Sequence, residues 1–218
     1  MFDSNGCNIN RVEYAMFGFL GINKPPAMTS RSVVNVVQRL VKPHKVGHAG
    51  TLDPLATGVL IVAVGKATRL MQHVHALPKK YRGTFQLGMR SDTEDIEGEI
   101  QTVENARQPS RDEIQAVVDD FQGTQSQQPP AFSALKIKGQ RAYSLARQGK
   151  SVKLEPREIT IHRIELIEYS FPFFTVDVQC STGTYIRSLG RDIGVRLECG
   201  AIMTELERTA IGSLTVEQ

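Results

Sequence analysis

Apolar residues recur at helical spacing in two stretches of the first third of the chain. Between residues 30 and 41, valines and leucines return every three or four positions behind Thr29 and Ser30, two residues of types that cap helices well, and the pattern stops before Pro43. A second, shorter helix is predicted over residues 67–77, ATRLMQHVHAL.

Two further helices have clear start or stop signals. Ser110 and Glu113 form a capping-box pattern in front of residues 114–121, IQAVVDDF. Over residues 185–199, isoleucines and leucines gather on one side of a helix that Gly200 is suited to end. We therefore predict helices in both stretches.

Strands are predicted where β-branched and aromatic residues alternate with polar ones or run without interruption. The run VLIVAVG at 59–65 is continuously apolar, which is typical of a central strand buried on both faces. The other predicted strands cover 17–24, 80–89, 159–170 and 173–181, the last two joined by a turn near Pro172. A proline break, a hairpin around residues 138–139 and a short basic helix are expected between 124 and 157.

The order of these elements indicates the fold class. Because strands outnumber helices and lie mostly in consecutive pairs, we predict an α+β fold with a mainly antiparallel mixed sheet. With 40% hydrophobic residues, the chain can bury a core as one domain, which we place at 16–218. Residues 1–15 are polar and patternless, so we expect a disordered leader or a true start at Met16.

Composition excludes several classes of protein. No stretch approaches the roughly 18 apolar residues of a membrane span, and the N-terminus lacks the basic and apolar regions of a secretory signal. Three widely spaced cysteines form neither a disulfide framework nor a CxxC motif, and the five histidines are scattered. We expect a cytoplasmic monomer that uses no metal and no cofactor.

Charge is distributed unevenly along the chain. The formal net charge is only +3, but residues 90–120 hold ten acids and three bases, and residues 136–157 hold seven bases and one acid. Two solvated surfaces would explain this pattern. A dipolar molecule whose basic face meets a polyanion would explain it as well.

The stretch GHAGTLDPLATGVL, residues 47–60, places a single carboxylate, Asp53, between glycines at the entrance of the predicted central strand. Pro54 holds Asp53 out of helical geometry, and Gly50 permits a positive φ or a close approach. An isolated loop aspartate is often only an Asx-turn cap. Asp53 has small polar neighbours and is followed by an apolar strand. This context favours instead an acid that is partly desolvated and directed at a ligand.

The same stretch resembles the catalytic motif of the TruB-like family of tRNA pseudouridine-55 synthases. Four other blocks resemble the family's motifs in the same order. They are GINKP at 21–25, KKYRGTFQLGMRSDTEDIEG at 79–98, QPPAFSALKIKGQRAYSLARQG at 128–149 and CSTGTYIRSLGRDIG at 180–194. Together the likeness covers nearly everything from residue 18 to about 212, and it implies the pseudouridine-synthase fold with an active-site cleft across the sheet.

The resemblance implies an isomerase that converts uridine 55 in the TΨC loop of tRNA by breaking the N1–C1′ bond and forming C5–C1′. Asp53 would be the catalytic aspartate, either adding covalently or abstracting the C2′ proton. Tyr81 would stack on the flipped base, and Arg187 would keep the carboxylate charged and oriented.

Further positions match the family's substrate-binding residues. His48 matches a base-displacing element of the GH motif, although a loop histidine bonded to backbone fits the sequence equally well. Lys24, Tyr185 and Leu206 match the wall of the active site. The RNA-binding insertion would span about 124–157. The cations expected to contact the RNA backbone are Lys79, Lys80, Arg82, Lys136, Lys138, Arg141 and Lys150.

The chain also departs from the family's pattern. Phe132 stands where a tyrosine is common, which removes one hydroxyl group. Many bacterial members continue into a C-terminal PUA domain, and the sequence ends at Gln218, so we expect only the catalytic domain. Two alternatives stay open, a non-catalytic tRNA-binding or folding chaperone and a pseudouridine synthase for another RNA.

Overall fold

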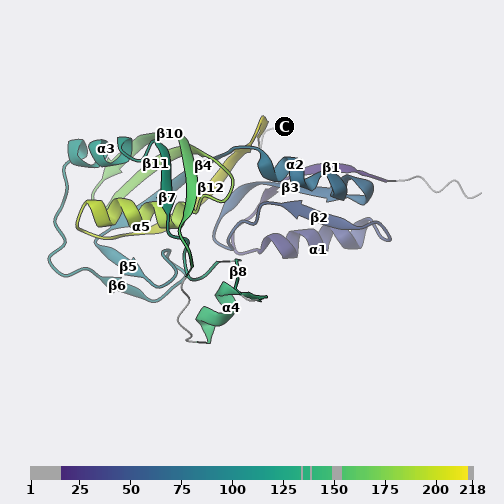
Figure 1. Cartoon of the computed structure of the whole chain (residues 1–218), viewed down its shortest axis with the longest axis horizontal. Helices are drawn as coiled ribbons and strands as arrows, with labels where there is room; N and C mark the ends of the chain where they lie inside the picture. The colour runs from purple at the N-terminus through teal and green to yellow at the C-terminus, as the bar shows by residue number, and fades with distance from the viewer. Residues whose placement is uncertain (1–15, 134, 138, 149–153, 216–218) are drawn as a thin grey trace, which may run out of the picture.

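The computed structural model describes residues 16–133, 135–137, 139–148 and 154–215. The expected leader 1–15 lies outside the described residues, as do Lys138 and Lys150. Within the described part, the expected α+β architecture is confirmed: one large sheet carries helices on its flanks (Figure 1).

The main sheet has nine strands, and seven of them follow one another in the order β1-β3-β12-β4-β11-β10-β7, with β2 paired to β3 and β13 to β12. All neighbours are antiparallel except β12 and β3, which run parallel. The strands are β1 (Gly18–Lys24), β2 (Val46–Ala49), β3 (Thr57–Val64), β4 (Lys79–Leu87), β7 (Gly123–Gln127), β10 (Arg157–Ser170), β11 (Phe173–Cys180), β12 (Ala201–Ile211) and β13 (Leu214–Thr215). Two short pairs lie apart from it: β5 (Met89–Ser91) with β6 (Ile100–Thr102), and β8 (Lys136–Ile137) with β9 (Gln140–Arg141).

The predicted helices are present with small changes at their ends. They are α1 (Ser30–Leu40), α3 (Arg111–Asp119), α4 (Ala142–Arg147) and α5 (Ile186–Arg196). The Thr29 side chain caps α1 by accepting from Ser32 N, and the predicted capping box of Ser110 and Glu113 closes reciprocally on α3.

The prediction of one helix over 67–77 is wrong for its first part, which is a 3₁₀ helix. A 3₁₀ segment, Gly65–Leu70, precedes a single α-helical segment, α2 (Met71–Ala76). No residue of α2 is buried, so tertiary packing does little to extend it, and isolated helical segments of this length are marginal.

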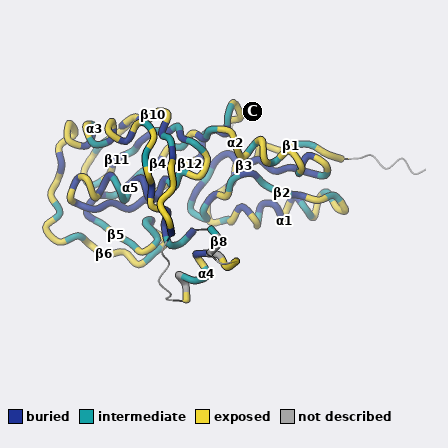
Figure 2. The backbone as a smooth tube through the Cα atoms, in the orientation of Figure 1, coloured by how far each residue is buried: buried dark blue, intermediate teal, exposed yellow. Residues whose placement is uncertain are grey.

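The core lies on both faces of the sheet (Figure 2). Leu60, Val62 and Val64 of β3 pack against α1, whereas Val59 and Ile61 point to the other face. The prediction that this strand is buried on both faces is therefore confirmed. A larger cluster lies beneath α3 and α5, around the stacked rings of Phe85 and Phe174.

Strand β12 was not predicted, although it lies between β3 and β4 inside the sheet. Its alternation is interrupted by register shifts between Met203 and Glu205 and between Arg208 and Ala210. It also buries a charged residue, Arg208, at 1% exposure. Both features hide the period-2 pattern from a reading of the sequence alone.

The segment expected as an insertion begins later than predicted. Residues 124–127 belong to β7, which pairs with β10 as the last strand of the main sheet, and Arg157 already opens β10. The described residues of the segment 128–156 lie off the sheet and include β8, β9 and α4; β8 and α4 are seen to one side of it in Figure 1. The hairpin expected around 138–139 is present as β8 and β9.

Candidate active site

Asp53 lies in the loop between β2 and β3, and several contacts hold this loop. The Ser30 hydroxyl, in the first turn of α1, accepts from Leu52 N at 2.9 Å and lies 3.2 Å from Leu52 O. Asp53 O accepts from Ala56 N, and the Lys24 ammonium donates to Pro54 O at 3.1 Å. The backbone on both sides of the carboxylate is therefore fixed, while the Asp53 side chain keeps 35% of its surface exposed.

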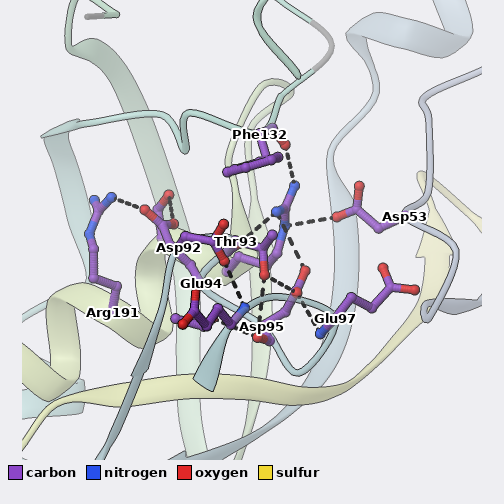
Figure 3. Close-up of polar contacts among 12 residues, drawn as sticks. Asp53, Asp92, Thr93, Glu94, Asp95, Glu97, Phe132 and Arg191 are labelled. Carbon is purple, nitrogen blue, oxygen red and sulfur yellow. Dashed lines mark hydrogen bonds and ion pairs between the residues drawn. The ribbon is translucent and has the colours of Figure 1, made fainter. Parts of the chain in front are cut away.

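Arg187, in the first turn of α5, pairs with Asp53. Figure 3 shows Asp53, Thr93, Asp95 and Phe132 gathered in this part of the site. The Nε of Arg187 lies 3.0 Å from Asp53 Oδ2, and Nη1 lies 3.4 Å from Asp95 Oδ2. Nη1 also donates to Thr93 O at 2.7 Å, and Nη2 donates to Phe132 O at 3.1 Å. One buried guanidinium is thus shared between two carboxylates, and its other donors are held by backbone carbonyls.

The contact with Phe132 bears on the departure from the family's pattern. It uses the backbone carbonyl, so the orientation of Arg187 does not depend on a hydroxyl at position 132.

The acidic loop after β5 is fastened to α5 by its side chains. Glu94 accepts from the Ser188 hydroxyl at 2.6 Å and pairs with Arg191. Asp95 is 2% exposed, and its second oxygen accepts from the Thr93 hydroxyl and from Glu97 N. Part of the negative run at 90–120 is thereby explained, because these acids position arginines and are not a solvated face.

The environment of Asp53 acts on its pKa in opposite directions. Burial raises the pKa above its usual value near 3.8, the charge and hydrogen bonding of Arg187 lower it, Asp95 raises it and Lys24 lowers it; the result is a raised pKa. An acid at this position is held in an environment that tunes its protonation, as catalytic groups commonly are.

Asp53 opens into a cavity of about 430 Å³. Five of the seven residues that the sequence places in the active site line it, namely Asp53, Tyr81, Tyr185, Arg187 and Leu206. They come from a loop, β4, the N-terminus of α5 and β12, so the cavity lies across the sheet. A volume of this size suits a nucleobase with its sugar.

The remaining two predicted residues, Lys24 and His48, are not part of the cavity lining. Lys24 is fully buried and donates to the carbonyls of Pro25, Met28 and Pro54. His48 lies in β2, partly buried, and burial together with the charges of Arg31, Arg208 and His75 lowers its pKa. A neutral imidazole at neutral pH follows, which agrees with a stacking role better than with a cationic one.

Three of the cations expected to contact RNA differ from one another in exposure and in their partners. Lys79 differs from the expectation: it is 4% exposed, and its ammonium donates to His75 O and Leu77 O, so it holds the end of α2. Arg82 is exposed but is committed to a bidentate pair with Asp177. Lys80 stays exposed and available. The side chains of Lys136 and Arg141 lie outside the described part, like Lys138 and Lys150.

Three supporting residues were missed by sequence reasoning. Asp95 belongs to a block that resembles the family, but nothing in its spacing indicates that it shares Arg187. Gln127 is 3% exposed and holds the backbone of Tyr185 from both sides, accepting from its N–H at 2.8 Å and donating to its carbonyl at 3.0 Å. The third, Arg208, lies in the strand that was not predicted.

Comparison with known proteins agrees with this geometry. Residues 38–186 match the model of the TruB family of pseudouridylate synthases, N-terminal domain. The chain belongs to this family. It is 49% identical to tRNA pseudouridine synthase B of Clostridium perfringens over 93% of its own length and 69% of that protein, and 41% identical to that of Rhodopirellula baltica over 94% and 61%. The chain thus spans about two thirds of the length of these TruB-family relatives.

Solved structures give the same fold for this family member. A Cbf5-Nop10-Gar1 complex matches with a TM-score of 0.71 and 31% identity over 99% of this chain and 54% of that one. An H/ACA RNP bound to a substrate RNA containing 2′-deoxyuridine matches with a TM-score of 0.69 and 28% identity over 98% and 53%. The predicted pseudouridine-synthase fold is therefore confirmed.

Two features are absent from the described residues. These residues contain no group of three or more His, Cys, Asp or Glu side chains that could hold a metal ion. In that same part of the chain, no helix is long and apolar enough to cross a membrane.

Proposed function

We propose that this chain isomerises uridine to pseudouridine in tRNA, at position 55 of the TΨC loop. The observation that carries the proposal is the pair of Asp53 and Arg187 at the wall of a cavity that Tyr81 and Leu206 also line, in a chain of the TruB family. The relatives named tRNA pseudouridine synthase B support tRNA as the substrate class.

The chemistry fits a single, partly buried carboxylate. Isomerisation breaks the N1–C1′ bond, turns the uracil ring and joins C5 to C1′, after which the C5 proton leaves and N1 carries a proton. The Asp53 carboxylate can add to C1′ or remove the C2′ proton, and either role needs its ionised form. Arg187 favours that form against the effect of burial.

The cavity also fits a base taken out of its stack. A uridine within a folded RNA loop must be extruded before its glycosidic bond can be reached. Tyr81 and Leu206 both line the cavity and offer it an aromatic and an aliphatic surface, and His48 lies in β2, directly before the loop that carries Asp53.

The test is pseudouridine formation on an unmodified tRNA transcript by the wild-type chain and by Asp53→Asn. We expect the variant to lose isomerisation and to bind tRNA within a few-fold of wild type, because an amide neither attacks carbon nor accepts the proton.

Turnover by Asp53→Asn would remove Asp53 from the chemistry. Binding without turnover by the wild-type chain would favour a non-catalytic tRNA-binding or folding chaperone. Turnover on another RNA but not on tRNA would change the substrate.

A further inference from the structure

Arg208 is a buried cation with no carboxylate partner among the residues that the structure describes. It is 1% exposed and takes part in none of the ion pairs found among the described residues. Burying a charge is unfavourable unless strong hydrogen bonds compensate. Its presence in the middle of the sheet therefore calls for a structural or functional reason.

The Arg208 side chain donates hydrogen bonds to both ends of the segment that carries Asp53. Its Nε donates to Val59 O at 2.7 Å, and its Nη2 donates to Gly50 O at 3.1 Å. The nine-residue step between these carbonyls contains the whole Asp53 loop. Because the guanidinium is planar and rigid, binding both carbonyls sets the distance between the ends of that loop.

Glycines stand where Arg208 approaches this loop most closely. Gly50 has a φ of +73°, and a Cβ there would lie 3.1 Å from Arg208 Nη1. Gly58 has a φ of +94°, and a Cβ there would lie 2.9 Å from the backbone nitrogen of Arg208 and still closer to its carbonyl oxygen. The glycines that flank Asp53 are thus required by the approach of β12, at one end by the side chain and at the other by the backbone.

Arg208 also faces the aromatic wall of the cavity. In the β12–β4 pair, Arg208 lies opposite Tyr81, and both residues line the cavity. Burial raises the pKa of the Tyr81 phenol, and the charge and hydrogen bonding of Arg208 oppose that rise. A single side chain therefore contacts both the loop of Asp53 and the residue expected to stack on the base.

We propose that Arg208 is a positioning residue that fixes the Asp53 loop relative to Tyr81, so that carboxylate and base meet in reactive geometry. The inference rests on the proposed isomerisation. Arg208 acts through the loop and the aromatic ring, and it should therefore affect the chemical step more than the binding of RNA.

The experiment compares wild type, Arg208→Met and Arg208→Lys in single-turnover isomerisation and in RNA binding. In Arg208→Met we expect the single-turnover rate constant to fall about 10²-fold, the scale of a 1 Å misplacement, with Kd within a few-fold of wild type. Arg208→Lys should recover part of the rate only, because one ammonium cannot bridge both carbonyls as the fork does.

Two further readouts do not depend on activity. Amide hydrogen exchange of residues 51–58 should become faster in Arg208→Met and, to a smaller extent, in Arg208→Lys. The pKa values of His48 and His75, which the charge of Arg208 helps to lower, should rise in Arg208→Met and stay near those of wild type in Arg208→Lys.

Val118→Ala is the matched control, since Val118 is fully buried in α3 and lies outside the cavity lining. It should lower the midpoint of thermal unfolding without changing either the rate constant or the exchange of 51–58. Any one of three results would overturn the assignment. The first is a wild-type rate constant in Arg208→Met, and the second is unchanged hydrogen exchange of residues 51–58 in both Arg208 variants. The third is an equal loss of rate in Val118→Ala and Arg208→Met. Failure of the proposed function would give a different pattern. The wild-type chain would then have no isomerase activity, while hydrogen exchange of residues 51–58 would still become faster in Arg208→Met.

Discussion

At the scale of single residues, the groups around Asp53 act in opposite directions on the ionisation of its carboxyl group. Burial and Asp95 disfavour the ionised carboxylate, while Arg187 and Lys24 favour it, and the pKa is raised on balance. The proposed chemistry needs the ionised form, so the raised pKa would have a consequence for activity. We expect the single-turnover rate to rise with pH through an acid limb whose midpoint lies above 3.8, and to level off near neutrality.

A series of single-turnover measurements on pre-bound tRNA, from acid to neutral pH, gives that midpoint. Asp95→Asn removes a charge that raises the Asp53 pKa, so its acid limb should lie at lower pH than that of wild type. A limb shifted to higher pH, or none above 3.8 in wild type, would contradict the assignment of the limb to Asp53.

The same shift predicts a stability effect. Because the Asp53 pKa is higher in the folded than in the unfolded state, the ionised carboxylate opposes folding at neutral pH, and this opposition disappears as pH falls below the unfolded value. Asp53→Asn should therefore unfold at a higher temperature than wild type at pH 7, and the difference should shrink towards pH 4. Calorimetry can resolve it, since ~1 kcal/mol corresponds to about 2–4 °C for a chain of this size.

At the scale of elements, the segment 128–156, whose described residues lie off the sheet, carries most of the local excess of basic residues. If it follows the RNA backbone, changing Lys136, Lys138 and Lys150 together to Gln should weaken binding and reduce its salt dependence. The slope of log Kobs against log salt should lose roughly 0.7 to 0.9 for each phosphate contact. Binding titrations at several salt concentrations measure this slope, with Arg163→Gln, at an exposed position of β10, as the matched control. An unchanged slope would mean that these lysines form only a solvated face.

At the scale of the whole molecule, the cavity lies beside the segment 128–156 and is large enough for one extruded nucleotide. Recognition should therefore concentrate on the flipped uridine and its neighbours in the loop, with the A-form stem read through its shape and phosphates. We expect an isolated T-arm hairpin to be isomerised nearly as fast as full tRNA. Changes beside the target uridine should slow the reaction more than exchanged stem base pairs do. Single-turnover rates on tRNA, hairpin and loop variants decide the matter, and an inert hairpin beside an active tRNA would require contacts outside the T-arm.

Sequence alone determined the elements whose signals are local. The period of valines in α1, the capping box of α3 and the continuous apolar run of β3 each act within a few residues, and the resemblance to the family's motifs predicted Asp53, Tyr81 and Arg187 as site residues. Only the tertiary structure decided which residues meet around them. Asp95, Gln127 and Arg208 contact partners 58 or more positions away, and whether a buried polar group is satisfied there depends on how the strands and loops pack. Strand β12 was not predicted for the same reason. Its bulges and its buried arginine are stable only beside β3 and β4. There, the segment that carries Asp53 supplies carbonyl groups to the guanidinium.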